Sequence, residues 1–133
     1  MRAANRKVTW RFVRAGSTAI LLAACGGGSS TPSPSPSPGD TATITIADNA
    51  VSPRNITIAR GSQVTFVNSD SRTHQMFSNP HPEHTDCPEI NDVGFLNPGQ
   101  SRQTGNMNTV RTCGYHDHEM STVLSLQGTI TIQ

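Results

Sequence analysis

All five histidines of this 133-residue chain lie between residues 74 and 118. Histidines are normally scattered along a sequence, and imidazole is the commonest protein ligand for copper and zinc. Five imidazoles in so short a stretch favour a metal site over the alternative, in which they are solvated loop residues. The candidate ligands are His74, His81, His84, His116 and His118.

The elements that must position these side chains have the pattern of β-strands. Apolar and polar residues alternate with period two in residues 41–48 (TATITIAD) and 55–59 (NITIA), as expected of half-buried strands. Residues 63–68 (QVTFVN) are β-branched and aromatic and predict a third strand. Residues 109–113 and 128–133 predict two more. Turn signals separate the segments and no long helix is indicated, so we expect an all-β sandwich.

A long loop rich in histidine and proline, residues 75–91, separates the third of these strands from the later ones. Its prolines stiffen the backbone, and a short helical turn is expected within it. This loop carries His81 and His84, which it could present toward the same end of the sandwich as His116 and His118.

The first 24 residues have the order of a secretory signal. Five basic residues precede an apolar or small segment at residues 15–24, which is far shorter than the ~20 residues needed to cross a bilayer as a helix. Residues 22–25 read LAAC and resemble the lipobox of bacterial lipoproteins. The resemblance implies cleavage before Cys25 and attachment of a lipid to it. The mature chain is then expected to be anchored in the cell envelope, on the periplasmic face of a membrane or at the cell surface.

Residues 25–40 read as a linker, because their glycines, serines and alternating prolines offer nothing to bury. Residues 41–133 remain, which is enough for one modest domain. Five of the ten basic residues lie in the signal, whereas all nine acidic residues follow it. The remaining arginines are scattered in the sequence, so no nucleic-acid partner is expected.

Three segments together, GSQVTFVNSDSRTH, CGYHDHEM and LQGTITI, resemble the cupredoxins, the plastocyanin and azurin family of small copper proteins. The resemblance covers most of residues 41–133. It implies a Greek-key sandwich in which one copper ion is held by an early His, a Cys and a His from the last loop, and a weak axial Met. On this chain these positions fall on His74, Cys113 and His116, with Met120 as the axial donor and His118 as the alternative second imidazole.

The axial position is ambiguous. Met120 stands at the spacing Cys-x6-Met, but cupredoxins place the axial Met two residues before the Gly that opens the final strand, and here Leu126 stands two residues before Gly128. Either the loop folds back to bring in the Met120 thioether, or Leu126 takes the axial place and the copper is three-coordinate.

The cysteines allow a second interpretation. If Cys25 carries the lipid, Cys87 and Cys113 remain, and two cysteines in an oxidising compartment usually pair. A Cys87–Cys113 disulfide would remove the thiolate and leave a histidine cluster able to hold Cu(II) or Zn(II). Against pairing, Cys113 stands three residues before His116, where the family places its ligand. A Cα separation within ~7 Å would favour the disulfide.

The leading hypothesis is a single-copper electron-transfer protein in the cell envelope with a redox partner protein, because thiolate and imidazole ligands together suit both oxidation states of copper. Such a site has no open coordination position, so we expect a carrier rather than an enzyme and no small-molecule substrate. The alternative is a protein for binding, storage or delivery of copper, or less favourably zinc, that uses the histidine cluster and has a disulfide in place of the blue copper site.

Overall fold

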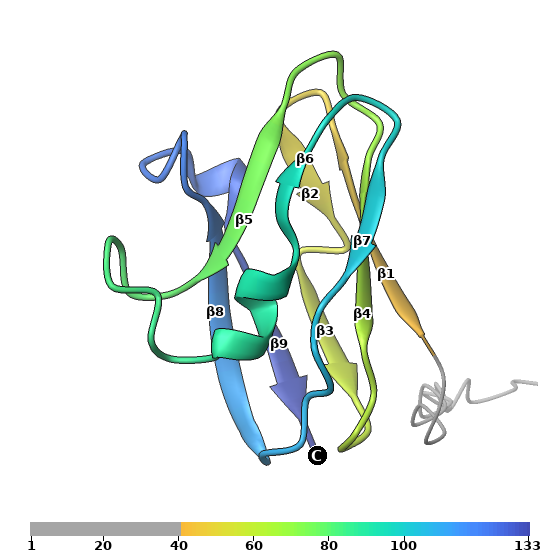
Figure 1. The fold of residues 1–133 in the computed structure, drawn as a ribbon, viewed down its shortest axis with the longest axis vertical. Helices are drawn as coiled ribbons and strands as arrows, with labels where there is room; N and C mark the ends of the chain where they lie inside the picture. The colour runs from red at the N-terminus through yellow and green to blue at the C-terminus, as the bar shows by residue number, and fades with distance from the viewer. Residues whose placement is uncertain (1–40) are drawn as a thin grey trace, which may run out of the picture. The chain divides into compact units, whose positions relative to one another are not determined.

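The computed structural model describes residues 41–133, which form nine β-strands and two short 3-10 helices (Figure 1). The predicted signal at residues 1–24, Cys25 and the linker at residues 25–40 lie outside the described residues. None of the helices in the described part is long and apolar enough to cross a membrane. The elements are β1 (Ala42–Ala47), β2 (Ala50–Ser52), β3 (Asn55–Ile58), β4 (Val64–Asn68), β5 (His74–Ser78), η1 (Pro88–Asp92), β6 (Gly94–Leu96), β7 (Ser101–Gln103), β8 (Arg111–Asp117), η2 (Leu124–Leu126) and β9 (Gly128–Ile132).

The strands form two mixed sheets. One has four strands in the order β2-β1-β4-β7, and the other has five in the order β3-β9-β8-β5-β6. In the first sheet β1 runs parallel to β4, and in the second β3 runs parallel to β9, whereas the remaining neighbours are antiparallel. The prediction of an all-β sandwich is confirmed, and η1 supplies a helical turn in the histidine-rich region.

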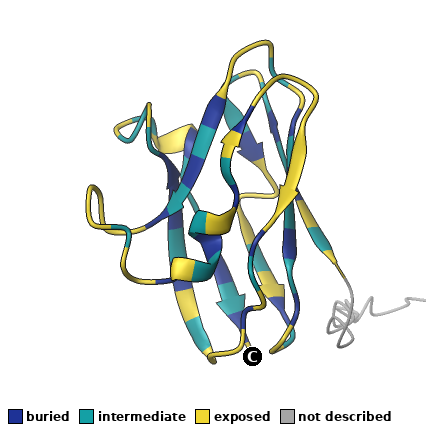
Figure 2. Cartoon of the chain, in the orientation of Figure 1, coloured by how far each residue is buried: buried dark blue, intermediate teal, exposed yellow. Residues whose placement is uncertain are grey.

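The core lies between the two sheets because each sheet turns one set of alternate side chains inward. Ile44, Ile46 and Phe66 come from the first sheet, Ile130 and Tyr115 from the second, and all are fully buried (Figure 2). The rings of Phe66 and Tyr115 meet edge to face across the core with their centroids 5.3 Å apart. Burial of such side chains contributes about 1.5–3 kcal/mol each, so the alternating pattern fixes which face of each strand is internal.

The alternation in β8 decides where the histidines go. Cys113 and Tyr115 belong to the core, and Asp117, the next alternate residue of the strand, is fully buried on the same face. His116 therefore points to the outer face of the five-stranded sheet, and His118 follows it on the same side. In the neighbouring strand β5, Met76 points into the core, and Phe77, the Cα partner of His116, lies on the outer face.

Two segments differ from the sequence prediction. Residues 74–78, expected to lie beyond a strand and in a loop, form β5 in the middle of a sheet, and β8 extends to Asp117 rather than ending at residue 113. Neither strand segment shows the usual alternation of apolar and polar residues in the sequence. The inward positions, which would usually be apolar, are occupied by His74, Ser78 and Asp117. The short strands β2, β6 and β7 were also not predicted, whereas β1, β3, β4 and β9 occur where expected.

Candidate metal centre

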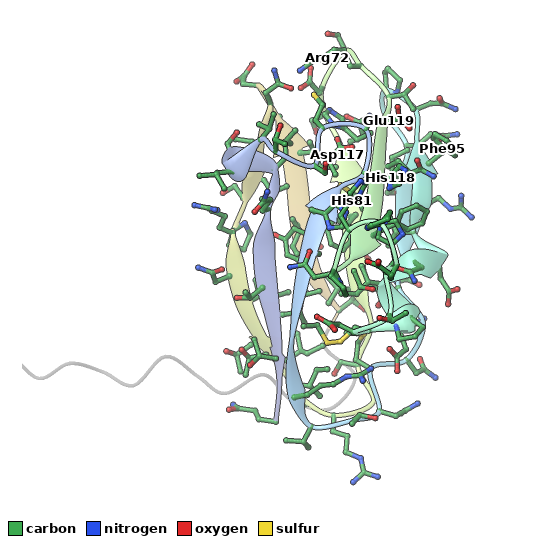
Figure 3. All side chains as sticks on the ribbon, turned by 90° about the vertical axis from the view of Figure 1, so that its left-hand side faces the viewer. Arg72, His81, Phe95, Asp117, His118 and Glu119 are labelled. Atoms are coloured by element: carbon green, nitrogen blue, oxygen red, sulfur yellow. A yellow bond between two sulfur atoms is a disulfide. The ribbon has the colours of Figure 1, made fainter. Side chains whose placement is uncertain are left out.

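Four of the five histidines converge on the outer face of the five-stranded sheet. One ligand atom from each of the four lies within 4.8 Å of those of the others. Figure 3 shows two of them, His81 and His118, beside each other on the side facing the viewer. Within residues 41–133 this is the one group of three or more potential metal ligands from His, Cys, Asp and Glu. Its members are His81, His84, His116 and His118.

The convergence follows from strand register and from the loop after β5. His116 lies in β8, and His118 directly follows its end, where the His118 N–H donates to the Gln75 carbonyl of β5 at 2.7 Å. Because the two histidines are two residues apart, both side chains lie on the same side of the sheet. The loop of residues 79–87 turns back over this face and brings His81 and His84 to it, and Figure 1 shows it projecting from the sandwich on the side of β8. Asn79 anchors its start, where its amide N–H donates to the Gly114 carbonyl at 3.0 Å. The Asn79 carbonyl in turn accepts from the Asp86 N–H at 2.8 Å, which draws the two ends of the loop together.

The backbone at His84 is held in an unusual conformation. Its φ of 54° lies in the left-handed region, which is uncommon for a residue other than glycine. The His84 N–H donates to the Pro80 carbonyl at 2.7 Å, and the His84 carbonyl accepts from Asn91 Nδ2 at 2.9 Å. Asn91 Oδ1 also accepts from the Ser78 N–H at the end of β5, so η1 ties His84 to the sheet. These bonds offset a conformational cost of about 1–3 kcal/mol and fix the point from which the imidazole projects.

One pair of nitrogen atoms has the spacing expected of two ligands on the same metal ion. His118 Nδ1 and His84 Nε2 are 3.2 Å apart. Two nitrogens bound tetrahedrally at about 2.0–2.1 Å from one ion would be about 3.3 Å apart. His116 Nε2 is buried without a hydrogen-bond partner, whereas its Nδ1 is 2.8 Å from Asn79 Oδ1. The orphaned Nε2 atom is the donor that a metal ion would satisfy.

Two of these imidazoles, those of His116 and His84, have lowered pKa values. Burial, followed by the nearby His84, His81 and His118 rings, lowers the pKa of His116 to about 4. Burial also lowers the pKa of His84, with smaller contributions from His118 and His81. The Phe77 ring lies beneath the group, with its centroid 4.6 Å from that of His84 and 5.4 Å from that of His118. A neutral imidazole offers the lone pair that a metal binds, so the lowered pKa values of His116 and His84 favour a metal ion over a proton at these two rings.

His74, the predicted early ligand, is not part of this group. It lies fully buried at the start of β5, where its Nδ1 is 2.5 Å from Asp117 Oδ2 and its Nε2 is 3.4 Å from Asp70 Oδ2. Both ring nitrogens face carboxylates, and the side chain joins β5 to β8 from inside the sandwich. The structure therefore corrects the prediction that His74 and His116 share one ion, because they lie on opposite faces of the same sheet.

Cys113, the predicted thiolate ligand, forms a disulfide with Cys87, with the Cα atoms 5.9 Å apart. This overturns the copper-thiolate interpretation and leaves the disulfide alternative. Because β8 continues through residue 117, an odd separation of three places Cys113 and His116 on opposite faces. Both cysteines are fully buried, and in Figure 3 the disulfide lies lower in the view than the labelled histidines.

The predicted axial position is likewise not at the histidine group. Met120 is half-buried against the hydrophobic core, and Leu126 is fully buried within it, whereas the four histidines lie outside the sheet. Asn79, Asn91 and Phe77, which shape the site, were not identified from the sequence. The pairing of Phe77 with His116 in β5 and β8 was the signal for Phe77, and it required recognising β5 as a strand.

No family model and no curated protein matches this chain. Solved structures do resemble it. A purple cupredoxin from Nitrosopumilus maritimus is 22% identical, with a TM-score of 0.54, and the match covers 69% of this chain and 99% of the other. The oxidised plastocyanin of Dryopteris crassirhizoma is 17% identical over 69% and 100% of the chains, with a TM-score of 0.55.

A mutant of amicyanin in its Cu(I) form is 13% identical, with a TM-score of 0.55 over 70% of this chain and 82% of the other. The resemblance inferred from the sequence is confirmed at the level of the fold, which is that of the cupredoxins. The residues at the position expected for the family's blue copper do not fit it, because Cys113 is oxidised and His74 faces two carboxylates.

Proposed function

We propose that this domain, which has the cupredoxin fold, binds one copper ion as Cu(II) through His81, His84, His116 and His118, and that it serves copper binding, storage or delivery. The observation that carries the proposal is the convergence of one ring nitrogen from each of three histidines on His116, whose Nε2 is buried without a hydrogen-bond partner. The lowered pKa values of His116 and His84 support it, since a proton would compete poorly with the ion.

The donor set favours copper among the common divalent ions. Imidazole binds copper and zinc well, and affinity at a given nitrogen site is greatest for Cu(II) in the first-row series. Thiolate and thioether ligands favour Cu(I), and this set contains neither. Zinc is therefore the competitor to test, and the oxidised ion is the form of copper that the site suits.

The donor set also argues against a blue electron carrier. An intense blue charge-transfer band depends on a copper-bound thiolate, and Cys113 is disulfide-bonded. The carrier hypothesis rested on Cys113, so the storage or delivery alternative is the better supported. His81 is exposed, so the ion can be loaded and withdrawn from solvent. If Cys25 is lipidated, this exchange would take place at the surface of a cell-envelope membrane.

A copper titration of the purified mature protein tests the proposal. We expect one equivalent of Cu(II) to bind, with a pale absorption spectrum, nitrogen hyperfine structure from imidazole ligands in the electron paramagnetic resonance spectrum, and higher affinity than for Zn(II). His116→Gln should lower the affinity at least a hundredfold, which is about 2.8 kcal/mol.

Thr112→Ala is the matched control, because Thr112 is exposed on the outer face of β8 and lies away from the histidines in the same strand. It should bind copper as the unmodified protein does. An intense blue band, or copper binding that survives His116→Gln unchanged, would overturn the proposal.

A further inference from the structure

We propose that Asn79 is a positioning residue that holds His116 as its Nδ1–H tautomer, with Gly114 providing the space for the Asn79 side chain, so that Nε2 is the atom presented to the metal. The inference deepens the proposed function and rests on it for its metal-binding consequence. The tautomer itself is a property of the metal-free protein and can be measured without any ion.

The first observation is that the two ring nitrogens of His116 have different surroundings. Nδ1 is 2.8 Å from Asn79 Oδ1, and an amide oxygen can only accept, so Nδ1 carries the proton. A neutral imidazole then has its lone pair on Nε2, which is buried without a partner and is the ligand atom left to join the other three histidines. In metal sites the nitrogen that is metallated is set by the hydrogen bond made by the other one.

The second observation concerns Gly114, two residues before His116 on the same outer face of β8. A Cβ atom at Gly114 would overlap Asn79 Nδ2 and lie only 3.0 Å from Asn79 Cγ. Glycine is therefore needed here for space: the Asn79 amide lies directly against the strand where a side chain would otherwise stand. This close approach brings Oδ1 within reach of the neighbouring ring.

The third observation is that the Asn79 backbone is fixed on both sides. Its N–H donates to the Gly114 carbonyl, and its carbonyl accepts from the Asp86 N–H. The side chain thus starts from a backbone already paired with β8, and only its own torsions remain to be set. Asn79 links the orientation of a ligand in the strand to the loop that supplies His81 and His84.

The chemical type of the acceptor also suits a metal ligand. An amide oxygen is uncharged, so it orients the ring without adding a negative charge that would stabilise an imidazolium. His74, by contrast, faces the carboxylates of Asp117 and Asp70 on its two nitrogens. The acceptor at His116 therefore favours a neutral ring, whose unprotonated Nε2 can donate its lone pair to a cation.

The decisive experiment is nitrogen-detected NMR of the histidine rings in the metal-free protein at neutral pH. We expect His116 to be the Nδ1–H tautomer in the unmodified protein and in Thr112→Ala. Asn79→Ala removes the acceptor and Gly114→Ala displaces it, so both should shift His116 toward the Nε2–H tautomer or a mixture. Asn79→Asp keeps an acceptor oxygen, so Nδ1 should stay protonated in this variant.

A copper titration of the same variants measures the consequence. Asn79→Ala and Gly114→Ala should bind Cu(II) about 10- to 100-fold more weakly while keeping all four histidines, as is usual when a partner of a ligand is removed. Thermal unfolding followed by circular dichroism checks that each variant is folded, and Asn79→Ala, which introduces no clash, decides the question if Gly114→Ala does not fold.

The two hypotheses fail in different ways. If the unmodified protein binds no copper, the proposed function is wrong, and the NMR measurement still decides the role of Asn79. An Nε2–H tautomer of His116 in the unmodified protein would overturn the inference, as would an Asn79→Ala variant with the same tautomer and the same copper affinity as the unmodified protein.

Discussion

His74 and His116 lie in neighbouring strands of one sheet, and their environments differ in almost every respect. His74 points inward between two carboxylates, Asp117 and Asp70, whereas His116 points outward and meets an amide and three other imidazoles. Both rings are buried, with exposed fractions of 0% and 2%. Burial alone therefore does not decide what a histidine does, and the groups that face its two nitrogens do.

Under the proposed function, the comparison describes a cupredoxin fold that would hold its metal on a different surface. His74 stands where the sequence resemblance places a copper ligand, yet here it fastens β5 to β8 from within the sandwich. The strand that this contact holds carries His116 on its opposite face. His74, at a ligand position of the family, here helps to hold β8, the strand that carries His116 of the histidine group on its other face.

The largest effect should come from removing His74. His74→Leu removes the imidazole that faces Asp117 Oδ2 and leaves this buried carboxylate with backbone N–H partners at Oδ1 alone, which costs about 3–5 kcal/mol of unfolding free energy. Urea unfolding of the metal-free protein measures the loss. Adding Asp117→Asn to this variant should restore part of the stability, because the uncompensated charge is then gone. A His74→Leu variant as stable as the unmodified protein would remove the distinction between the two histidines.

The second effect tests the contact between the loop and the core. Replacing Cys87 and Cys113 together by Ala removes a link between residues 26 positions apart in the sequence. Loop-closure entropy for a link of this length is about 3.5 kcal/mol, so the unfolding free energy should fall by about that amount. Copper affinity should fall as well, because Cys87 ends the loop that carries His81 and His84. Unchanged affinity in a folded double variant would show that the Asn79 and Asn91 hydrogen bonds suffice to hold the loop.

The third effect is a pH dependence that belongs to His116. Its pKa is about 4 in the folded protein, below the ordinary value of 6.5, so between these values the unfolded chain binds a proton that the folded protein does not. Stability of the metal-free protein should therefore fall as the pH falls from about 6.5 to 4, by about 2 kcal/mol after allowance for solvent screening. Urea unfolding across this range should show a shallower slope in His116→Gln, and an equal slope in both proteins would contradict the assignment.

How far the sequence predicts this molecule depends on which side chains occupy the inner faces. Strands such as β1 and β4 were predictable because their apolar residues, among them Ile44, Ile46 and Phe66, alternate with period two. Burial of this apolar face stabilises the strand. The inner positions of β5 and the end of β8 instead hold His74 and Asp117, whose burial depends on pairing with each other. Local composition does not reveal such a pair, since its two members are 43 residues apart.

The same limit explains the outcome for the candidate metal site. The spacing Cys-x2-His suggested that Cys113 and His116 share an ion, which requires the chain to leave the strand between them. Once β8 extends to Asp117, the two side chains face opposite ways. The four histidines of the site were all among the candidates, but their selection depended on a loop fold set by backbone hydrogen bonds of Asn79 and by Asn91, which no periodicity reveals.

The smallest effect should come from removing His81, the exposed histidine of the site, and it concerns Cu(II) affinity. His81 is exposed and emerges from the loop, whereas His116 emerges from a strand and is fixed by Asn79. His81→Ala should lower Cu(II) affinity about tenfold, or ~1.4 kcal/mol, because three oriented imidazoles remain. It should leave the stability of the metal-free protein unchanged, since an exposed side chain is removed. Competition with a chelator of known affinity measures the loss against that of His116→Gln, and a loss for His81→Ala as large as for His116→Gln would mean that the loop is as rigid a part of the site as the sheet.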